Sequence, residues 1–263
     1  MSVVLNDCVE LARRAGEAIM AIYAQAFSVT EKDDRSPLTE ADMAAHRCIV
    51  EGLRRIAPEW PVLSEEGAGI EWSVRRQWQR YWLVDPLDGT REFIKRNGEF
   101  TVNIALIDHG RPLLGVVHAP ALDQAWWAEV GQGAWHCPSH GVPQRLHCRR
   151  PASQPLRVIA SRSHLDARTA ALLARIGDCQ RIGLGSSLKF CRIAEGEADV
   201  YPRFGPTSEW DTAAGQCVLE QAGGVVLDRD GRPFVYNAKA SLLNGDFLAL
   251  GDPDLPWQAW LHD

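Results

Sequence analysis

The chain has 263 residues, of which 46% are hydrophobic, and a formal net charge of −6. This length allows one large core or two closely packed halves, and the negative charge argues against a nucleic-acid-coating protein, which needs a basic face. Seven scattered cysteines without a Cys-x-x-Cys pair are typical of a reduced compartment and not of a disulfide or zinc framework. Charges interrupt the N-terminal segment and no run is long enough to span a bilayer, so we expect a cytoplasmic protein without a signal peptide.

The N-terminal residues predict two amphipathic helices. Apolar residues recur at helical spacing over 4–23 and again over 48–56, and the charged stretch 31–36 indicates an exposed loop between them. Thr39 and Asp42 fit a helix N-cap and its reciprocal acid. The cap alone explains both residues. The alternative is that this helix end points into a site, where Asp42 accepts a proton or a hydrogen bond.

Two short apolar runs stop at acidic residues. Residues 61–64 are followed by Glu65 and Glu66, and residues 82–84 by the string Asp-Pro-Leu-Asp-Gly-Thr at 85–90. Proline removes an amide donor, so we expect the second strand to end at Pro86, and the glycine permits a tight turn. Paired carboxylates on such a turn suit Mg²⁺, although the string alone is equally compatible with a plain polar turn.

The remaining sequence divides into two halves, 1–150 and 151–263, near a proline-rich and basic stretch. Residues 91–99 indicate a polar connection, and strands are predicted at 100–107, 113–117, 126–128 and 133–135. Their short polar turns favour an antiparallel sheet. The second half alternates strands at 156–160, 199–201, 224–227 and 247–250 with helices at 166–176, 187–195 and 211–222, which is typical of an α/β layer.

Three features of the second half are candidates for binding an anion or a metal. The loop Gly183–Ser187, followed by Lys189, could be an anion cradle or an ordinary glycine-rich loop. Arg203 has a guanidinium group that matches phosphate geometry. Asp211 opens a helix of small residues and could be a cap, but Ala213–Gly215 would let that helix end press closely against another element.

Taken together, Glu65–Glu66, the string at 85–90 and Trp-Asp-Thr-Ala-Ala-Gly at 210–215 resemble the motifs of the inositol monophosphatase superfamily of Mg²⁺-dependent, lithium-sensitive phosphatases. The strings at 92–103, 161–164, 185–190 and 201–206 resemble its CysQ-type 3′(2′),5′-bisphosphate nucleotidases, and the likeness covers nearly the whole chain. The resemblance implies a mixed α+β and α/β fold, the layered α-β-α-β-α sandwich, with the site between the two halves.

The resemblance also implies roles for individual residues. Glu65, Asp85 and the carbonyl of Leu87 would hold one Mg²⁺, and Asp85, Asp88 and Asp211 a second, with a third, weaker ion near Glu65. Thr90, paired with Asp42, would orient and deprotonate a metal-bound water, and Glu65 is the third predicted catalytic residue. Substrate contacts are expected from Glu65, Leu87, Asp88, Gly89, Thr90 and Asp211, from Ser186, Lys189 and Arg203 at a 5′-phosphate, and from His164 near the nucleoside.

The expected reaction is hydrolysis of the 3′-phosphate of adenosine 3′,5′-bisphosphate, or of its 5′-phosphosulfate analogue, in sulfur assimilation and nucleotide recycling. Two alternatives remain: an inositol or sugar monophosphate phosphatase, in which Lys189 and Arg203 are surface charges, and a non-catalytic nucleotide or metal sensor, against which the intact Asp42 and Thr90 argue. The expected partner is a small molecule and not a nucleic acid polymer. Monomer and homodimer both stay open, as does peripheral attachment to the inner face of the membrane, which is described for relatives.

Overall fold

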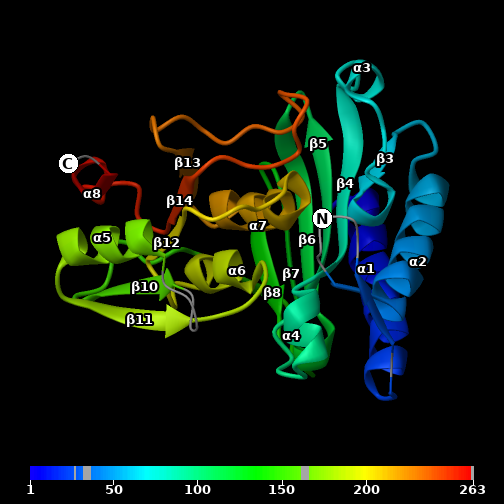
Figure 1. Ribbon diagram of the computed structural model, residues 1–263, viewed down its shortest axis with the longest axis horizontal. Coiled ribbons are helices and arrows are strands. Elements are labelled where there is room, and N and C mark those ends of the chain that lie inside the picture. Colours follow the sequence, from blue (N-terminus) through cyan, green and yellow to red (C-terminus); the bar gives the residue numbers. More distant parts are fainter. Residues whose placement is uncertain (27, 32–36, 161–165, 262–263) are drawn as a thin grey trace.

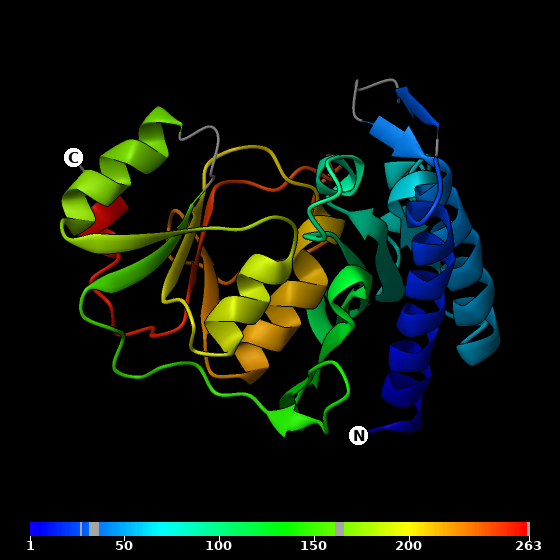
Figure 2. The same ribbon diagram turned by 90° about the horizontal axis from the view of Figure 1, so that it is seen from below.

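A computed structural model describes residues 1–26, 28–31, 37–160 and 166–261, which stack in five layers (Figures 1 and 2). The layers are, in order, helices α1 (Val3–Tyr23) and α2 (Glu40–Ile56), a seven-stranded sheet, helices α6 (Leu188–Ala194) and α7 (Glu209–Gln221), a five-stranded sheet, and helices α5 (Ala167–Ile176) and α8 (Gln258–Leu261). The predicted α-β-α-β-α sandwich is therefore confirmed. Within the described residues, no helix combines the length and the apolar character that crossing a membrane requires.

The seven-stranded sheet carries the first half of the chain. Its spatial order is β3 (Val62–Ser64), β4 (Arg80–Asp88), β5 (Thr101–Asp108), β6 (Arg111–Ala119), β7 (Gln124–Glu129), β8 (Gly133–Cys137) and β9 (Gln144–Arg145). Neighbouring strands are antiparallel except β3 and β4, which are parallel. The expected antiparallel sheet is confirmed for β5 to β8, and the parallel pair at its edge becomes important for the site.

The five-stranded sheet carries the second half. Its order is β11 (Cys179–Gly183), β10 (Leu156–Ala160), β12 (Val200–Arg203), β14 (Phe247–Leu250) and β13 (Val225–Asp228). Strand β10 runs parallel to β11 and β12, whereas β14 is antiparallel to β12 and β13. The sequence did not predict β11, because this edge strand exposes Gln180 and Arg181 and lacks an apolar run.

Short elements connect the layers and correct two expectations. They are β1 (Val29–Glu31), β2 (Pro37–Thr39), the 3₁₀ turns η1 (Glu65–Gly67) and η2 (Pro120–Leu122), and the helices α3 (Trp72–Arg75) and α4 (Thr90–Ile94). The expected polar connection at 91–99 begins with α4, in which Phe93 is fully buried. Strand β4 continues through Pro86 to Asp88 instead of ending at the proline. Most of the charged stretch 31–36 lies outside the described residues.

Three apolar clusters hold the five layers together. One lies between α1, α2 and the seven-stranded sheet, and another between the five-stranded sheet and α5 and α8. The middle cluster combines Tyr81 and Trp126 of the first sheet with Phe190 of α6 and Phe247 of the second sheet. Because buried residues of both sheets share this core, α7 is held against β4 to β8 of the first sheet, and α6 packs on α7 and β12.

Candidate active site

The parallel pair β3 and β4 brings two acidic residues to one edge of the sheet. Ser64 pairs with Val84 where the β3–β4 pairing ends, so the next residues, Glu65 of η1 and Asp85 of β4, follow at neighbouring positions. The Glu65 carboxyl group is close enough to Asp85 to contribute to the raised pKa of that residue. The strand register thus explains why two acid-ended strands, which are separated in sequence, converge.

A β-bulge in β4 turns Asp85 and Asp88 toward the same site. Asp85 pairs with Asn103 and Asp88 pairs with Thr101, so three steps along β4 match two steps along β5. In a regular strand, residues three apart point to opposite faces, and one extra residue reverses this relation. The expectation that Pro86 ends the strand is therefore wrong. Gly89 then adopts the positive φ that was anticipated for it, at 92°.

The N-terminus of α7 supplies the third aspartate. Asp211 belongs to a capping box and its Oδ2 accepts the backbone N–H of Ser208 at 2.9 Å. The predicted close packing of this helix is confirmed, because a Cβ at Gly115 of β6 would lie 2.6 Å from the Ala214 carbonyl oxygen. A Cβ at Gly215 would lie 2.5 Å from the Phe190 ring. Small residues therefore allow the Asp211 end of α7 to reach the seven-stranded sheet.

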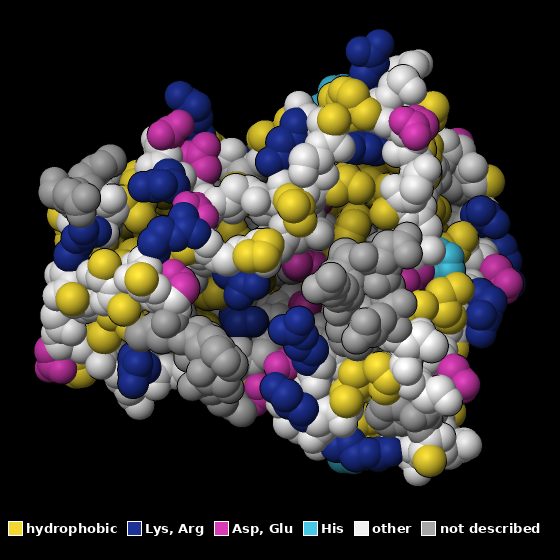
Figure 3. All heavy atoms as spheres, in the orientation of Figure 1, with side chains coloured by type: hydrophobic (Ala, Val, Ile, Leu, Met, Phe, Trp, Pro, Cys, Tyr) yellow, Lys and Arg dark blue, Asp and Glu magenta, His cyan; other side chains and the backbone are white. Residues whose placement is uncertain are grey.

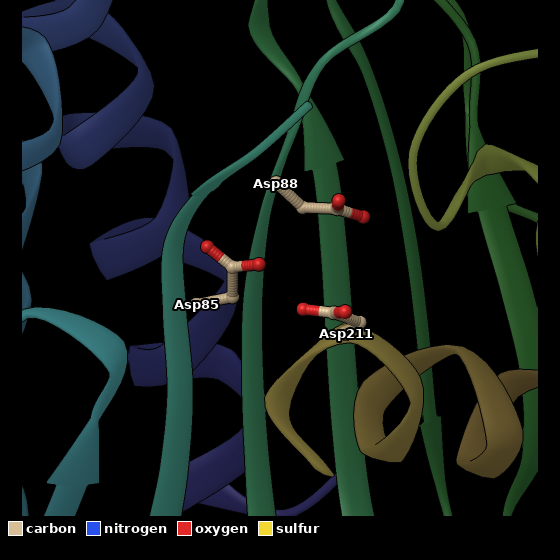
Figure 4. A group of neighbouring side chains, drawn as sticks. All are labelled: Asp85, Asp88 and Asp211. Atoms are coloured by element: carbon tan, nitrogen blue, oxygen red, sulfur yellow. The ribbon is translucent and has the colours of Figure 1, made fainter. Parts of the chain in front are cut away.

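Asp85, Asp88 and Asp211 form one carboxylate cluster. Their side chains point toward one another (Figure 4), and each offers an oxygen within 4.8 Å of the others. Asp85 is buried and the other two are half-buried. Burial raises the pKa of Asp211 to about 8 and that of Asp88 to about 6, and burial with the neighbouring Glu65, Asp88 and Asp211 raises the pKa of Asp85 well above its ordinary value. Closely spaced oxygen donors with uncompensated charge fit a hard divalent cation.

We expect the metal-free protein to become less stable as the pH rises from about 4 to about 8. Asp88 and Asp211 have pKa values of about 6 and about 8 in the folded state against an ordinary 3.8, so the folded state binds more protons over this window and its stability falls with pH. Bound Mg²⁺ should offset the negative charge of the ionised cluster and so stabilise the folded protein. Urea unfolding in EDTA and in Mg²⁺ measures the effect. The stabilisation by Mg²⁺ should grow from pH 5 to pH 8, and equal stabilisation at both would contradict the prediction.

Asp42 and Thr90 meet beside the cluster. Asp42 Oδ2 accepts the backbone N–H of Thr39 at 2.8 Å and its hydroxyl at 2.6 Å, which confirms the predicted capping box. Asp42 Oδ1 lies 3.3 Å from the Thr90 hydroxyl, which is also 3.3 Å from the Leu87 carbonyl oxygen. The same acid therefore caps α2 and contacts Thr90, so the two interpretations of the cap are compatible.

A cavity of about 620 Å³ extends from Asp88 and Asp211 to Ser186, Lys189 and Arg203. Lys189 Nζ donates to the Ser186 carbonyl at 2.8 Å and lies 5.5 Å from the centre of the Tyr201 ring. Arg203 Nη2 donates to the Pro206 carbonyl at 2.9 Å, whereas its buried Nε has no partner among the described residues. Basic and acidic side chains lie side by side near the centre of this face (Figure 3). His164 lies outside the described residues.

The backbone of the expected anion cradle is already occupied. The N–H of Gly185 donates to Glu99 Oε2 at 2.8 Å, and the N–H of Ser187 donates to Asp88 Oδ2 at 2.5 Å. These two backbone N–H groups therefore already have protein acceptors, so an anion cradle at this loop would have to use its other groups. The side chains of Ser186 and Lys189 remain available to the cavity.

Sequence reasoning missed several residues around the site. Arg91, Lys95 and Glu99, from α4 and the segment after it, line the cavity, and no local pattern distinguishes them from ordinary surface charges. Ser187 contacts Asp88 through its backbone N–H, and Asn103 contacts it through its side-chain amide. The side chains of Asn103 and Ser187 are also hydrogen-bonded to each other. Asn103 had a detectable signal, because it is the one amide in the otherwise apolar run 102–107.

Comparisons with known proteins agree with this architecture. Residues 1–250 match the inositol monophosphatase family. The chain is 53% identical over 247 residues to the 3′(2′),5′-bisphosphate nucleotidase CysQ of Escherichia coli K12, which covers 92% of this chain and 98% of that protein. The crystal structure of CysQ from Bacteroides thetaiotaomicron gives a TM-score of 0.81 at 43% identity and covers 94% of this chain and 96% of its own. An IMPase of Thermotoga maritima gives 0.78 at 26% identity, covering 98% and 95%. The chain therefore belongs to the inositol monophosphatase family.

Proposed function

We propose that this protein is a Mg²⁺-dependent phosphatase that removes the 3′-phosphate of adenosine 3′,5′-bisphosphate and releases AMP and phosphate. The observation that carries the proposal is one cavity lined both by Asp88 and Asp211, two members of the carboxylate cluster, and by the cations Lys189 and Arg203. A substrate with two separated phosphates matches this arrangement, since one can meet the metal and the other the cations. The 53% identity to 3′(2′),5′-bisphosphate nucleotidases supports the same activity.

We further propose 3′-phosphoadenosine 5′-phosphosulfate as a second substrate, because it differs from the bisphosphate only beyond the 5′-phosphate. Both reactions would serve sulfur assimilation and nucleotide recycling in the cytoplasm. Metal dependence, typically on Mg²⁺, is a property of the family, and inhibition by Li⁺ is typical of it as well.

The residues that would hold Mg²⁺ are Asp85, Asp88 and Asp211, together with Glu65 and the carbonyl of Leu87. We propose two ions, with Asp85 shared between them and a third, weaker ion near Glu65. When bound, Mg²⁺ would offset the charge on the scissile phosphate and lower the pKa of an attacking water. Asp85 and Asp211 reach this point from different halves of the chain, so the metal site depends on the packing of α7 against the sheet.

Thr90 and Asp42 would guide the proton of the attacking water. With its own hydrogen donated to Asp42 Oδ1, the Thr90 hydroxyl keeps a lone pair to accept a proton from water. The two bonds from Thr39 fix Asp42 in place as the acceptor. As the water oxygen bonds to phosphorus, the water proton would pass to Thr90 and the Thr90 proton to Asp42. The bond to the 3′-oxygen breaks with its electron pair on that oxygen, which takes a proton from solvent to become the 3′-hydroxyl of AMP.

Replacing Thr90 with valine should test this relay. We expect kcat to fall by about 10²-fold or more, because a positioned acid or base typically contributes 10² to 10⁴. The KM for the bisphosphate and the Kd for Mg²⁺ should change much less than kcat, since the main proposed role of Thr90 is on the water. Thr90→Ser keeps the hydroxyl and is the matched control. Equal losses in the serine and valine variants would contradict the relay.

The proposed function is tested by comparing kcat/KM for adenosine 3′,5′-bisphosphate and inositol 1-phosphate in Mg²⁺, with and without Li⁺. We expect a clear preference for the bisphosphate, inhibition by Li⁺ and no turnover in EDTA. A preference for the inositol ester would replace the proposal with the inositol phosphatase alternative. Binding of Mg²⁺ without turnover of any phosphate ester would favour the sensor.

A further inference from the structure

The carboxylate of Asp88 is held by groups from two other elements. Its Oδ2 accepts the Ser187 N–H at 2.5 Å, at the start of α6, and lies 3.5 Å from Asn103 Nδ2, in β5. The Ser187 hydroxyl lies 2.7 Å from Asn103 Oδ1 and 2.8 Å from the Thr101 hydroxyl. Asn103 and Ser187 are each 1% exposed and Thr101 is fully buried.

The hydrogen-bond directions in this network determine one another. Because Asn103 Oδ1 can only accept, the Ser187 hydroxyl donates to it. The Ser187 oxygen is then free to accept the proton of the Thr101 hydroxyl. With its oxygen fixed in this way, Asn103 presents its amide donor to Asp88. A buried network whose hydrogen-bond directions are fixed in this way favours one arrangement of its members.

The network lies directly beside the bulge that orients the aspartates. Asn103 and Thr101 are the strand partners of Asp85 and Asp88, so they lie on β5 across from the irregular part of β4. Ser187 comes from the other half of the chain and completes the network from α6. The orientation of Asp88 thus depends on contacts across the boundary between the two halves.

The same turn of chain also carries the cation proposed for the second phosphate. Lys189 lies two residues after Ser187, and its Nζ donates to the carbonyl of Ser186 at 2.8 Å. Ser186 adopts a positive φ of 47°, and its Cβ lies within 3.3 Å of where a Cβ on Gly89 would be. A shift of this turn would therefore move Lys189 and the donor to Asp88 together.

We infer that Asn103 and Ser187 are positioning residues that orient Asp88 for the metal and couple the metal site to the second-phosphate site. This inference rests on the proposed function, because it assigns Asp88 to the metal and Lys189 to the phosphate. Coupling between two sites is reciprocal, so a ligand with a 5′-phosphate should raise the affinity for Mg²⁺. Adenosine, which lacks that phosphate, should raise it less than AMP does.

The test is calorimetric titration of the full chain with Mg²⁺, alone and in the presence of AMP or adenosine. Asn103→Ala and Ser187→Ala should each raise the Kd for Mg²⁺ by about 10-fold, because losing an outer partner of a metal ligand typically costs 10- to 100-fold. Both substitutions should also reduce the difference between the Kd for Mg²⁺ measured in AMP and that measured in adenosine. Ser153→Ala is the matched control: it removes a serine hydroxyl from the buried carboxylate of Asp199, at the far end of β12 from the cavity, and should change neither quantity.

Thr101→Val keeps the test decisive if the alanine variants do not fold. It preserves the shape of the side chain and removes only the donor to Ser187, so a smaller rise in the Kd is expected. A Kd within 2-fold of wild type in the folded variants would overturn the inference. The wild-type protein separates the two claims: failure to bind Mg²⁺ or to hydrolyse the bisphosphate refutes the proposed function, whereas an active wild type with normal variants refutes the inference alone.

Discussion

Replacing Asp85 with asparagine is expected to lower kcat/KM for adenosine 3′,5′-bisphosphate by about 10³-fold or more. Asp85 is the buried member of the cluster and the proposed ligand shared by two ions. A metal contributes several kcal/mol of charge stabilisation in the transition state, and each 1.36 kcal/mol corresponds to tenfold in rate. Steady-state kinetics at several Mg²⁺ concentrations measure the loss, which saturating Mg²⁺ should not restore.

The same substitution should stabilise the metal-free protein. Asp85 is surrounded by Glu65, Asp88 and Asp211, and burial together with these acids raises its pKa well above its ordinary value. Asparagine relieves that repulsion, so we expect the melting temperature in EDTA to rise while its increase on adding Mg²⁺ disappears. A protein that loses function and gains stability has lost a functional group and has not simply unfolded.

Asp199→Asn is the control for Asp85→Asn. Asp199 is equally buried, at 1% exposure, but its carboxylate accepts bonds from Ser153 and from the Arg157 N–H. Its substitution should lower the melting temperature and leave kcat/KM near wild type, the reverse of the Asp85 result. Near-normal turnover in Asp85→Asn, or a fall in its melting temperature in EDTA like that of the control, would contradict the shared-ligand assignment.

The second large effect is expected for Lys189→Met with substrates that carry a 5′-phosphate. Methionine keeps the apolar stem beside Tyr201 and removes the charge. A hydrogen bond to a charged group contributes about 1.5–3 kcal/mol, so the KM for adenosine 3′,5′-bisphosphate should rise by about 10- to 100-fold. The KM for adenosine 3′-monophosphate, which lacks the 5′-phosphate, should change little.

The pair of substrates makes this comparison independent of general damage to the site. Lys189 also lowers the pKa of Asp88, against the larger effect of burial, so any change that its loss causes at the metal site acts on both substrates alike. Only the contact with the 5′-phosphate distinguishes them. An equal rise in KM for both substrates would show that Lys189 acts through Asp88 and does not bind the second phosphate.

Features that depend on local sequence could be predicted without the structure. Three such features are the string at 85–90, the capping box of Thr39 and Asp42, and the small residues after Asp211. The residues that make up each one lie within a few positions of one another. Apolar periodicity reports which face of each element is buried, so it sufficed for most helices and strands, whereas the five-layer sandwich was expected from the family resemblance. Helix α4 is too short, at five residues, to show such a pattern.

Features that depend on pairing between distant segments could not be predicted. The bulge that brings Asp85 and Asp88 to one side exists only in the register between β4 and β5. The loop Gly183–Ser187 left an anion cradle and an ordinary loop both open, and only the structure shows that the N–H groups of Gly185 and Ser187 donate to Glu99 and Asp88. For the same reason the sequence showed Asn103 as a polar residue in an apolar strand but not as a contact of Asp88.

Phosphorus NMR of adenosine 3′,5′-bisphosphate during incubation with the protein and Mg²⁺ tests the central claim most directly. The metal cluster is proposed to act on the 3′-phosphate while Lys189 and Arg203 hold the other. The 3′-phosphate resonance should decline as inorganic phosphate accumulates, and the 5′-phosphate should persist as that of AMP, with no change in EDTA. Loss of the 5′-phosphate first, or an unchanged spectrum under conditions in which inositol 1-phosphate is hydrolysed, would contradict it.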